Sequence, residues 1–292
     1  MKSLDPIRFI GALKGLLDGK VEIPESLVDN PLLKVLLNRR SVRSFQKKDI
    51  PDDVFRVILE AGRLAPSTVN LQSWSFGVFD QESWLRSFEK PMPFKGNKAL
   101  MITGDLHRLR LALDEFPFKP LVEYTLGVIN ASIAAYAMNV AAEACGVGSV
   151  MLSETGESGF YDAQYLKERL GLPDGVFPIM TIVFGYPAAR PKGMPPKLAL
   201  SEITFAGRYK EPDAKATKRW LDQMMAGYRA LYVTKSFQGQ LKHYLSKSDR
   251  AEAGLHKLIF YKKEESLASS PHRKRGAARV PREPSRHGGV SK

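Results

Sequence analysis

The chain has 292 residues, 43% of them hydrophobic and 26% charged, which is ordinary for a globular protein and excludes collagen-like and coiled-coil chains. This length can bury a sizeable core in one large domain or two small ones. The formal net charge is +13, but residues 262–292 hold nine Lys/Arg and three Asp/Glu, so +6 belongs to that segment and +7 to the other 261 residues, which weakens a nucleic-acid or membrane interpretation of the rest.

The cysteine content and hydropathy of the sequence indicate the cellular compartment of the protein. The single cysteine, Cys145, excludes a disulfide within the chain and a cysteine-based metal motif, and it fits a reducing environment. No secretory signal is visible at the start of the sequence. The most apolar stretch, 128–152, contains Asn130, Asn139 and Glu143, so a buried helix followed by a strand explains it better than a membrane span. We therefore expect a cytoplasmic protein without a transmembrane segment.

The first elements are helical. Residues 1–35 are predicted to form one or two short helices interrupted by Pro24 and Pro31. Residues 52–65 predict an amphipathic helix, because their apolar side chains recur at helical spacing. Asp52 and Asp53 suit the first turn of this helix, and Pro66 ends it.

The middle of the chain interleaves strands and helices. Strands are predicted at 74–79, 99–103, 149–152 and 178–184. Helices are predicted at 123–145, which is rich in small residues, and at 162–170. This order indicates an α/β or α+β fold.

The composition changes after about residue 207. Residues 213–232 and 236–261 are predicted to be helical, and residues 264–292 are predicted to be disordered because they are almost devoid of apolar side chains. We expect four parts, namely an N-terminal helical segment, a central domain, a helical C-terminal extension and a basic tail, with bounds 1–35, 36–207, 208–261 and 262–292.

Two polar segments could carry a binding site. Residues 38–45 place three guanidiniums and two hydroxyls within six residues, which could hold a phosphate, although a solvated basic face is the alternative. Residues 65–76 form a loop rich in short hydrogen-bonding side chains, which could offer donors to a flat heterocycle or could be a simple polar turn. A weaker third group combines residues 150–156, 185–187 and 192–197.

Taken in order, Arg-Arg-Ser-Val-Arg-x-Phe at 39–45 and Ala-Pro-Ser-x-x-Asn-x-Gln-x-Trp-x-Phe at 65–76 resemble the nitroreductase family of FMN-dependent oxidoreductases. Ala-Cys-Gly-Val-Gly at 144–148, Leu-Gly-Leu-Pro at 170–173 and Phe-Gly-Tyr-Pro at 184–187 support the resemblance, which covers roughly residues 32–205. It implies an α+β fold with a mostly antiparallel sheet inside a helical shell. It also implies a homodimer with FMN at the interface.

The resemblance also implies roles for individual residues. The phosphate and ribityl chain of FMN would be held by Arg39, Arg40 and Ser41, and Lys197 would complete the phosphate site. Arg43 would lie at the N1/O2 edge of the flavin ring. The other subunit would contribute Pro66, Ser67, Thr68 and Asn70. The ring and its N5 would lie near Ser153, Glu154, Thr155 and Gly156.

The implied activity is electron transfer from NADH or NADPH through FMN to a small electron-poor acceptor such as a nitroaromatic or a quinone. A flavin reductase, an enone reductase or a reductive dehalogenase would use the same fold, and Glu123 and Tyr124 could then serve as substrate-binding lid residues or simply as packing residues.

A hypothesis of another class is nucleic-acid or anionic-surface binding by the basic C-terminal region. That tail alone is more typical of a solubilising or targeting segment. No metal site is expected, because the five histidines show no ligand spacing.

Overall fold

The computed structural model describes residues 24–153, 162–190, 195–231 and 236–260. The strands are β1 (Trp74–Asp80), β2 (Lys98–Asp105), β3 (Gly148–Leu152) and β4 (Val176–Gly185). The helices are α2 (Pro31–Asn38), α3 (Asp52–Arg63), α4 (Gln81–Phe88), α5 (His107–Ala112), α6 (Pro120–Ala144), α7 (Ala163–Leu170), α8 (Leu200–Ile203), α9 (Ala214–Leu231) and α10 (Phe237–Ile259). The tail at 262–292, with its predicted disorder, lies outside the described residues, as does most of the N-terminal segment.

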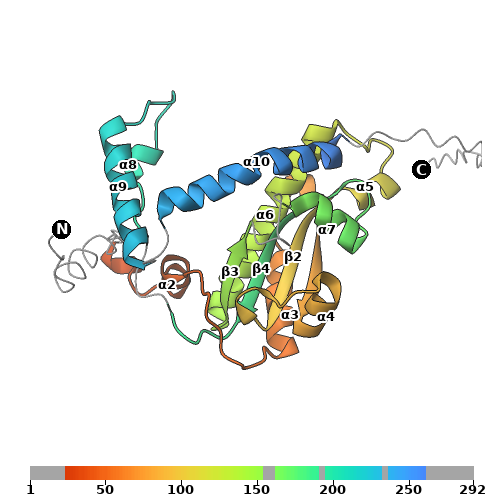
Figure 1. Cartoon of the computed structure of the whole chain (residues 1–292), viewed down its shortest axis with the longest axis horizontal. Helices are drawn as coiled ribbons and strands as arrows, with labels where there is room; N and C mark the ends of the chain where they lie inside the picture. Colours follow the sequence, from red (N-terminus) through yellow and green to blue (C-terminus); the bar gives the residue numbers. More distant parts are fainter. Residues whose placement is uncertain (1–23, 154–161, 191–194, 232–235, 261–292) are drawn as a thin grey trace, which may run out of the picture. The chain divides into compact units, whose positions relative to one another are not determined.

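The four strands form one sheet in the order β1-β2-β4-β3, and every neighbouring pair is antiparallel (Figure 1). This confirms the expected α+β class with an antiparallel sheet. The register places Trp74 opposite Gly104 at one end of β1, and Asp80 opposite Lys98 at the other end. The two outer strands are therefore β1 and β3, and both segments with candidate site residues adjoin these strands.

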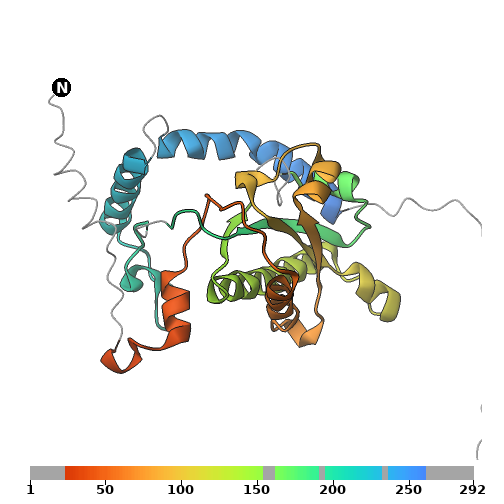
Figure 2. The ribbon, with the colours of Figure 1, turned by 90° about the horizontal axis from the view of Figure 1, so that it is seen from below.

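The sheet lies between two layers of helices (Figure 2). One face packs on α6 and α3, and it contributes alternate residues such as Leu100, Ile102 and Ile182 to the larger core. The Phe55 ring of α3 lies edge-on to the Phe184 ring of β4. The other face packs on α4 and α7 through Met101 and Val183. Because β2 and β4 are covered on both faces, they are apolar almost throughout rather than alternating.

Helix α6 lies unusually close to the sheet. A Cβ added at Gly104 of β2 would stand 2.7 Å from the Cα of Gly127 in α6, so two glycines are needed where helix and strand meet. By length and composition α6 is the one helix in the described part of the chain that could cross a membrane. However, it buries Glu123, Asn130 and Asn139 against the rest of the protein, as expected for a core helix.

The side of α6 turned away from the sheet is also apolar. Val122, Ile129, Ile133 and Tyr136 recur along it at helical spacing and are 39–48% exposed. A helix that is apolar all round is normally covered on all sides. This exposed stripe is therefore a surface that a single chain leaves uncovered.

Two details differ from the sequence-based expectations. Helix α2 runs to Asn38, past the predicted limit at residue 35, and Pro31 begins that helix instead of interrupting it. Helices α4, α5 and α8 were not predicted. Helix α4 follows β1 without a loop and begins with a capping box between Asp80 and Ser83, whose hydrogen bonds lower the pKa of the Asp80 carboxyl.

Candidate functional site

The first motif lies along the outer edge of the sheet. The backbone N–H of Val42 donates to the carbonyl of Ser149 in β3 at 2.9 Å, and Ser41 forms a parallel bridge with Ser149. Farther along, the N–H of Gln46 donates to the carbonyl of Tyr186 at 2.8 Å, just after β4. The segment is thus fixed by backbone hydrogen bonds, with Val42 in the core and Arg43 and Ser44 exposed.

Two glycines of the weaker motifs allow this close approach. A Cβ at Gly148 would stand 2.8 Å from the side chain of Val42, and a Cβ at Gly185 would stand 2.8 Å from the ring of Phe45. The sequence motifs at 39–45, 144–148 and 184–187 therefore form one cluster in space. Val42 is fully buried in it, whereas Arg43 points to the exposed side.

The three arginines of this segment are not paired with carboxylates in the described part of the chain. Arg40 donates through Nη1 to the carbonyls of Leu37 and Arg39 at 2.7 and 2.9 Å, which caps the C-terminal end of α2. The Nε of Arg39 is buried and has no partner among the described residues. Arg43 is exposed. Guanidiniums gathered without carboxylates provide donors for an anion such as a phosphate.

The second motif forms a strained loop between α3 and β1. Val69, Asn70 and Gln72 have positive φ angles of 48°, 56° and 47°. Each such conformation costs about 1–3 kcal/mol in a non-glycine residue, and it is least favourable for β-branched valine. Val69 is also 88% exposed, so its apolar side chain is held in water. Strain of this kind is concentrated at functional sites.

Helix α6 fixes the base of this loop. The side-chain oxygen of Asn130 accepts from the backbone N–H of Thr68 at 3.1 Å and from its hydroxyl at 3.2 Å. The Asn130 amide donates to Ser73 Oγ at 2.7 Å. Asn130 is fully buried, and its bond to Ser73 is shielded from water. They hold the loop while Thr68 and Asn70 remain exposed.

The two motifs lie at opposite corners of the sheet. The loop enters β1 at Trp74, which is level with Gly104 in β2. Ser149, beside the first motif, is level with Phe184 in β4, which pairs with Lys98 at the far end of β2. Six residues along a strand and three strand spacings across the sheet place the corners roughly 25 Å apart in a flat sheet. A single chain therefore does not join them into one site.

The third group is less well defined. Ser153 is exposed directly after β3, while Glu154, Thr155 and Gly156 lie outside the described residues. Lys197 is exposed in the segment before α8, and the neighbouring Pro196 carbonyl accepts from the Trp220 indole at 3.2 Å. No described contact joins Lys197 to the first motif. The roles of these residues remain predictions.

Glu123 and Tyr124 are packing residues in this fold. The Glu123 carboxylate is buried, pairs with Arg110 and accepts from the backbone N–H of Phe118 at 2.9 Å. Tyr124 packs edge-on against Phe177 with ring centroids 5.4 Å apart, and burial raises the pKa of its hydroxyl. Neither side chain is free to act as a lid residue in this structure.

No group of three or more metal-ligating side chains occurs among the described residues.

Two asparagines that support the motifs were not assigned a role from sequence. Asn130 holds the loop, and the Asn139 amide donates to Ser149 Oγ at 2.6 Å, which fixes β3 where the first motif lies against it. Both are at least 99% buried in an otherwise apolar helix. A buried amide needs a hydrogen-bond partner, so an asparagine within an apolar helix indicates a specific polar contact. That was the signal available in the sequence. The sequence could not show which partner each amide has.

The chain belongs to the nitroreductase family. A family model with the description "Nitroreductase family" matches residues 36–98 and 85–186, which together span just over half of the chain. These residues include both motifs, all four strands and helix α6.

Individual relatives match a larger share of the chain than the family model does. The chain is 26% identical over 236 residues to the FMN reductase (NAD(P)H) of Bacillus subtilis strain 168, covering 70% of this chain and 93% of the relative. Among solved structures, B. megaterium NfrA2 has a TM-score of 0.68 at 20% identity, over 79% of this chain and 98% of that one. The NADPH:FMN oxidoreductase from Vibrio harveyi, solved with NAD+, has a TM-score of 0.60 at 21% identity, over 74% and 92%. These structures support the fold.

Proposed function

We propose that this protein is an FMN-dependent oxidoreductase that takes electrons from NADH or NADPH and passes them to a small electron-poor acceptor in the cytoplasm. Family membership and the FMN reductase among its relatives support this proposal. The observation that carries it is the presence of two complementary surfaces on one chain: a corner with three arginines that form no ion pair among the described residues, and a strained polar loop at the opposite corner.

The residues of this chain fit FMN in a homodimer. Arg39, Arg40 and Ser41 offer charged and hydroxyl donors suited to its phosphate and ribityl chain. The exposed Thr68 and Asn70 of a second copy offer hydrogen-bonding groups suited to its flat ring. The apolar stripe of α6 gives the second copy a surface to cover, since it would otherwise face water. Because the two corners lie apart in one chain, a twofold dimer would build two equivalent sites.

In this site FMN would supply the hydride and electron chemistry, while the protein binds and orients it. Arg43 would place a fixed positive charge against the N1/O2 edge of the ring. A preorganised cation at this edge stabilises negative charge there. The loop residues Pro66, Ser67, Thr68 and Asn70 would orient the ring, and Lys197 and the 153–156 segment would complete its surroundings. No side chain of the protein has to act as a nucleophile or metal ligand.

The acceptor is a separate part of the proposal. The name of the Bacillus subtilis relative favours a free flavin as one acceptor, beside nitroaromatics and quinones. Comparing the rates for free FMN, a quinone, a nitroaromatic and a halophenol under identical conditions would rank them. A halophenol that turned over fastest would favour reductive dehalogenation instead.

The absorption spectrum of the purified protein tests the central proposal. We expect flavin bands between about 300 and 550 nm, release of FMN on denaturation, and bleaching on anaerobic addition of NADH or NADPH. Sedimentation should show a dimer. A colourless protein that neither takes up added FMN nor oxidises either nucleotide would contradict the proposal.

A further inference from the structure

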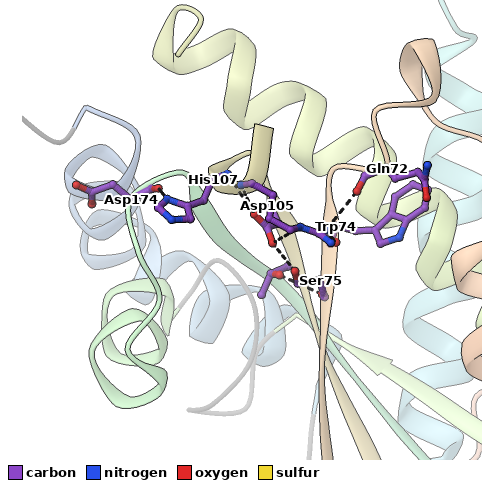
Figure 3. A network of polar contacts seen from close by, with 8 residues as sticks. Gln72, Trp74, Ser75, Asp105, His107 and Asp174 are labelled. Carbon is purple, nitrogen blue, oxygen red and sulfur yellow. Dashed lines mark hydrogen bonds and ion pairs between the residues drawn. The ribbon is translucent and has the colours of Figure 1, made fainter. Parts of the chain in front are cut away.

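The strained loop has a second anchor in addition to Asn130. The backbone N–H of Asp105, the last residue of β2, donates to the Ser73 carbonyl at 3.0 Å. Arg108 donates through Nη2 to the Trp74 carbonyl and to the Gln72 carbonyl, the latter at 3.4 Å. Three successive carbonyls at the end of the loop are thus held by one short segment, which we call the Asp105–Arg108 clamp. Gln72, Trp74 and Asp105 of this region are shown in Figure 3.

The carboxylate of Asp105 organises this clamp. Its side chain is 8% exposed, and its Oδ2 accepts from Ser75 Oγ and faces the Arg108 Nε at 3.2 Å. Its Oδ1 accepts from the backbone N–H groups of His107 and Arg108 at 3.1 and 3.4 Å. Both oxygens are therefore satisfied, as burial of a carboxylate requires. Figure 3 shows the Asp105 side chain directed toward Ser75 in β1.

The loop needs such a restraint because its backbone is unfavourable. The positive φ angles at Val69, Asn70 and Gln72 persist only where surrounding contacts hold the backbone in this conformation. Within the loop, the N–H of Gln72 donates to Ser67 Oγ at 3.0 Å. At the end of the loop, the carbonyl of the same Gln72 is held by Arg108. The clamp thus acts directly on a residue in the strained conformation.

Both partners of the clamp lie outside the two motifs. Arg108 is in α5, its side chain is 59% exposed, and its contacts to Gln72 and Trp74 are made to backbone atoms. Such contacts restrain the course of the main chain without requiring a particular loop side chain. The exposed position of Arg108 also means that a polar substitution there leaves the core intact.

We propose that Asp105 and Arg108 are positioning residues for the flavin site. They hold residues 66–72 in the outward, strained form in which Thr68 and Asn70 meet the FMN bound by the partner subunit. This inference rests on the proposed function, and it assigns the clamp an effect on flavin binding and on the ring environment. Arg108 itself would not touch the flavin.

The experiment uses the full chain and three variants. Arg108→Gln removes the cation and the paired donors, and Arg108→Lys restores a cation with a less suitable geometry. Arg86→Gln is the matched control, because Arg86 is 69% exposed and forms an ion pair with Glu82 in α4, which packs on the sheet face opposite α6. For each protein we would measure the melting temperature, the FMN dissociation constant, and the visible spectrum at saturating FMN. Hydrogen exchange at Asn70, Leu71 and Gln72 would be followed without FMN.

We expect Arg108→Gln to speed exchange of the three loop amides at least tenfold and to weaken FMN binding about tenfold, with a melting temperature close to that of Arg86→Gln. The flavin bands should shift, because the ring environment changes even in molecules that still bind FMN. Arg108→Lys should recover part of the affinity. A merely structural role would lower the melting temperature and leave the spectrum of bound FMN unchanged.

Two results would overturn the clamp proposal. One is unchanged loop exchange in Arg108→Gln, and the other is faster exchange with unchanged FMN affinity and spectrum. Flavin binding by the wild-type protein is measured first, so a failure of the proposed function is recognised separately as the absence of binding in the unsubstituted chain.

Discussion

Three arginines that form one basic run in the sequence have three different surroundings in the fold. Arg40 caps the end of α2 through two backbone carbonyls, Arg39 buries a nitrogen that has no partner among the described residues, and Arg43 is exposed. These differences arise because the segment leaves the end of α2 and then lies along β3 with Val42 in the core. The three arginines should therefore contribute unequally to an anion site, because Arg40 already donates to two backbone carbonyls of the fold.

Arg43 allows a test of charge at a single position. We expect Arg43→Ala to lower the reduction potential of bound FMN by about 30 mV, which for a two-electron couple corresponds to about 1.4 kcal/mol. The reason is that a fixed cation near N1/O2 stabilises the negative charge that reduction places there. The measurement is an anaerobic titration against a reference dye, with the rate of reduction by NADH as a second readout.

Lys47→Ala is the control for this prediction, since Lys47 is an exposed cation four residues farther along the same segment. It makes the same change in net charge without changing the predicted site. A potential that is equal in wild type and in an Arg43→Ala protein that still holds FMN would contradict the assigned role of Arg43.

At the scale of elements, α6 combines three tasks. It supports the sheet through the Gly104–Gly127 contact, it holds the loop through Asn130, and it fixes β3 through Asn139. The two asparagines are nine residues apart, or about 13 Å along the helix axis. A shift of α6 would therefore reach both corners of the sheet together.

The contact between Gly104 and Gly127 can be tested directly. We expect Gly104→Ala to reduce the free energy of unfolding by about 1–3 kcal/mol, because the added methyl group meets backbone atoms 2.7–3.1 Å away that cannot rotate aside. It should also weaken FMN binding through displacement of Asn130. Urea unfolding followed by circular dichroism measures the first effect, and flavin fluorescence measures the second.

Gly227→Ala provides the comparison, since a Cβ at this position in α9 meets nothing within 4 Å. Alanine favours the helix over glycine by up to about 1 kcal/mol, so this variant should be as stable as wild type or slightly more stable. Equal unfolding curves for Gly104→Ala and Gly227→Ala would show that α6 does not depend on the close approach.

Sequence periodicity predicted α3, α6, α9, α10 and the positions of all four strands, because their apolar spacing or length is distinctive. It could not show whether the strands are parallel, since β2 and β4 are buried on both faces and lack the alternation of a half-exposed sheet. The antiparallel arrangement came from the family resemblance. Helix α4 was missed because it follows β1 directly, although Asp80 and Ser83 hold the spacing of a capping box.

The candidate site was predictable in its residue types but not in its support. The two motifs were visible as polar segments, whereas Asp105 and Arg108 carry no local signal that separates them from ordinary residues at the end of a strand. Their relation to Gln72 and Trp74 depends on the pairing of β1 with β2, which brings residues about thirty positions apart together. Such partners are fixed by sheet register and not by spacing along the chain.

At the scale of the whole molecule, the separation of the two motifs is the decisive feature. The loop and the arginine segment flank the two outer strands and lie at different ends of them. A twofold partner that covers the stripe of Val122, Ile129, Ile133 and Tyr136 would bury apolar surface and supply each corner with its complement. In this proposal, association and cofactor binding would support each other.

This geometry has a genetic consequence, since two inactivating substitutions in different copies of the chain can complement each other. An Arg39→Ala chain and an Asn70→Ala chain should each form inactive homodimers, yet a mixed dimer would carry both changes in one site and neither in the other. Random mixing after reversible unfolding should then restore about a quarter of the wild-type sites. The readout is FMN bound per chain, and a mixture as inactive as its parents would mean that each site is built within one subunit.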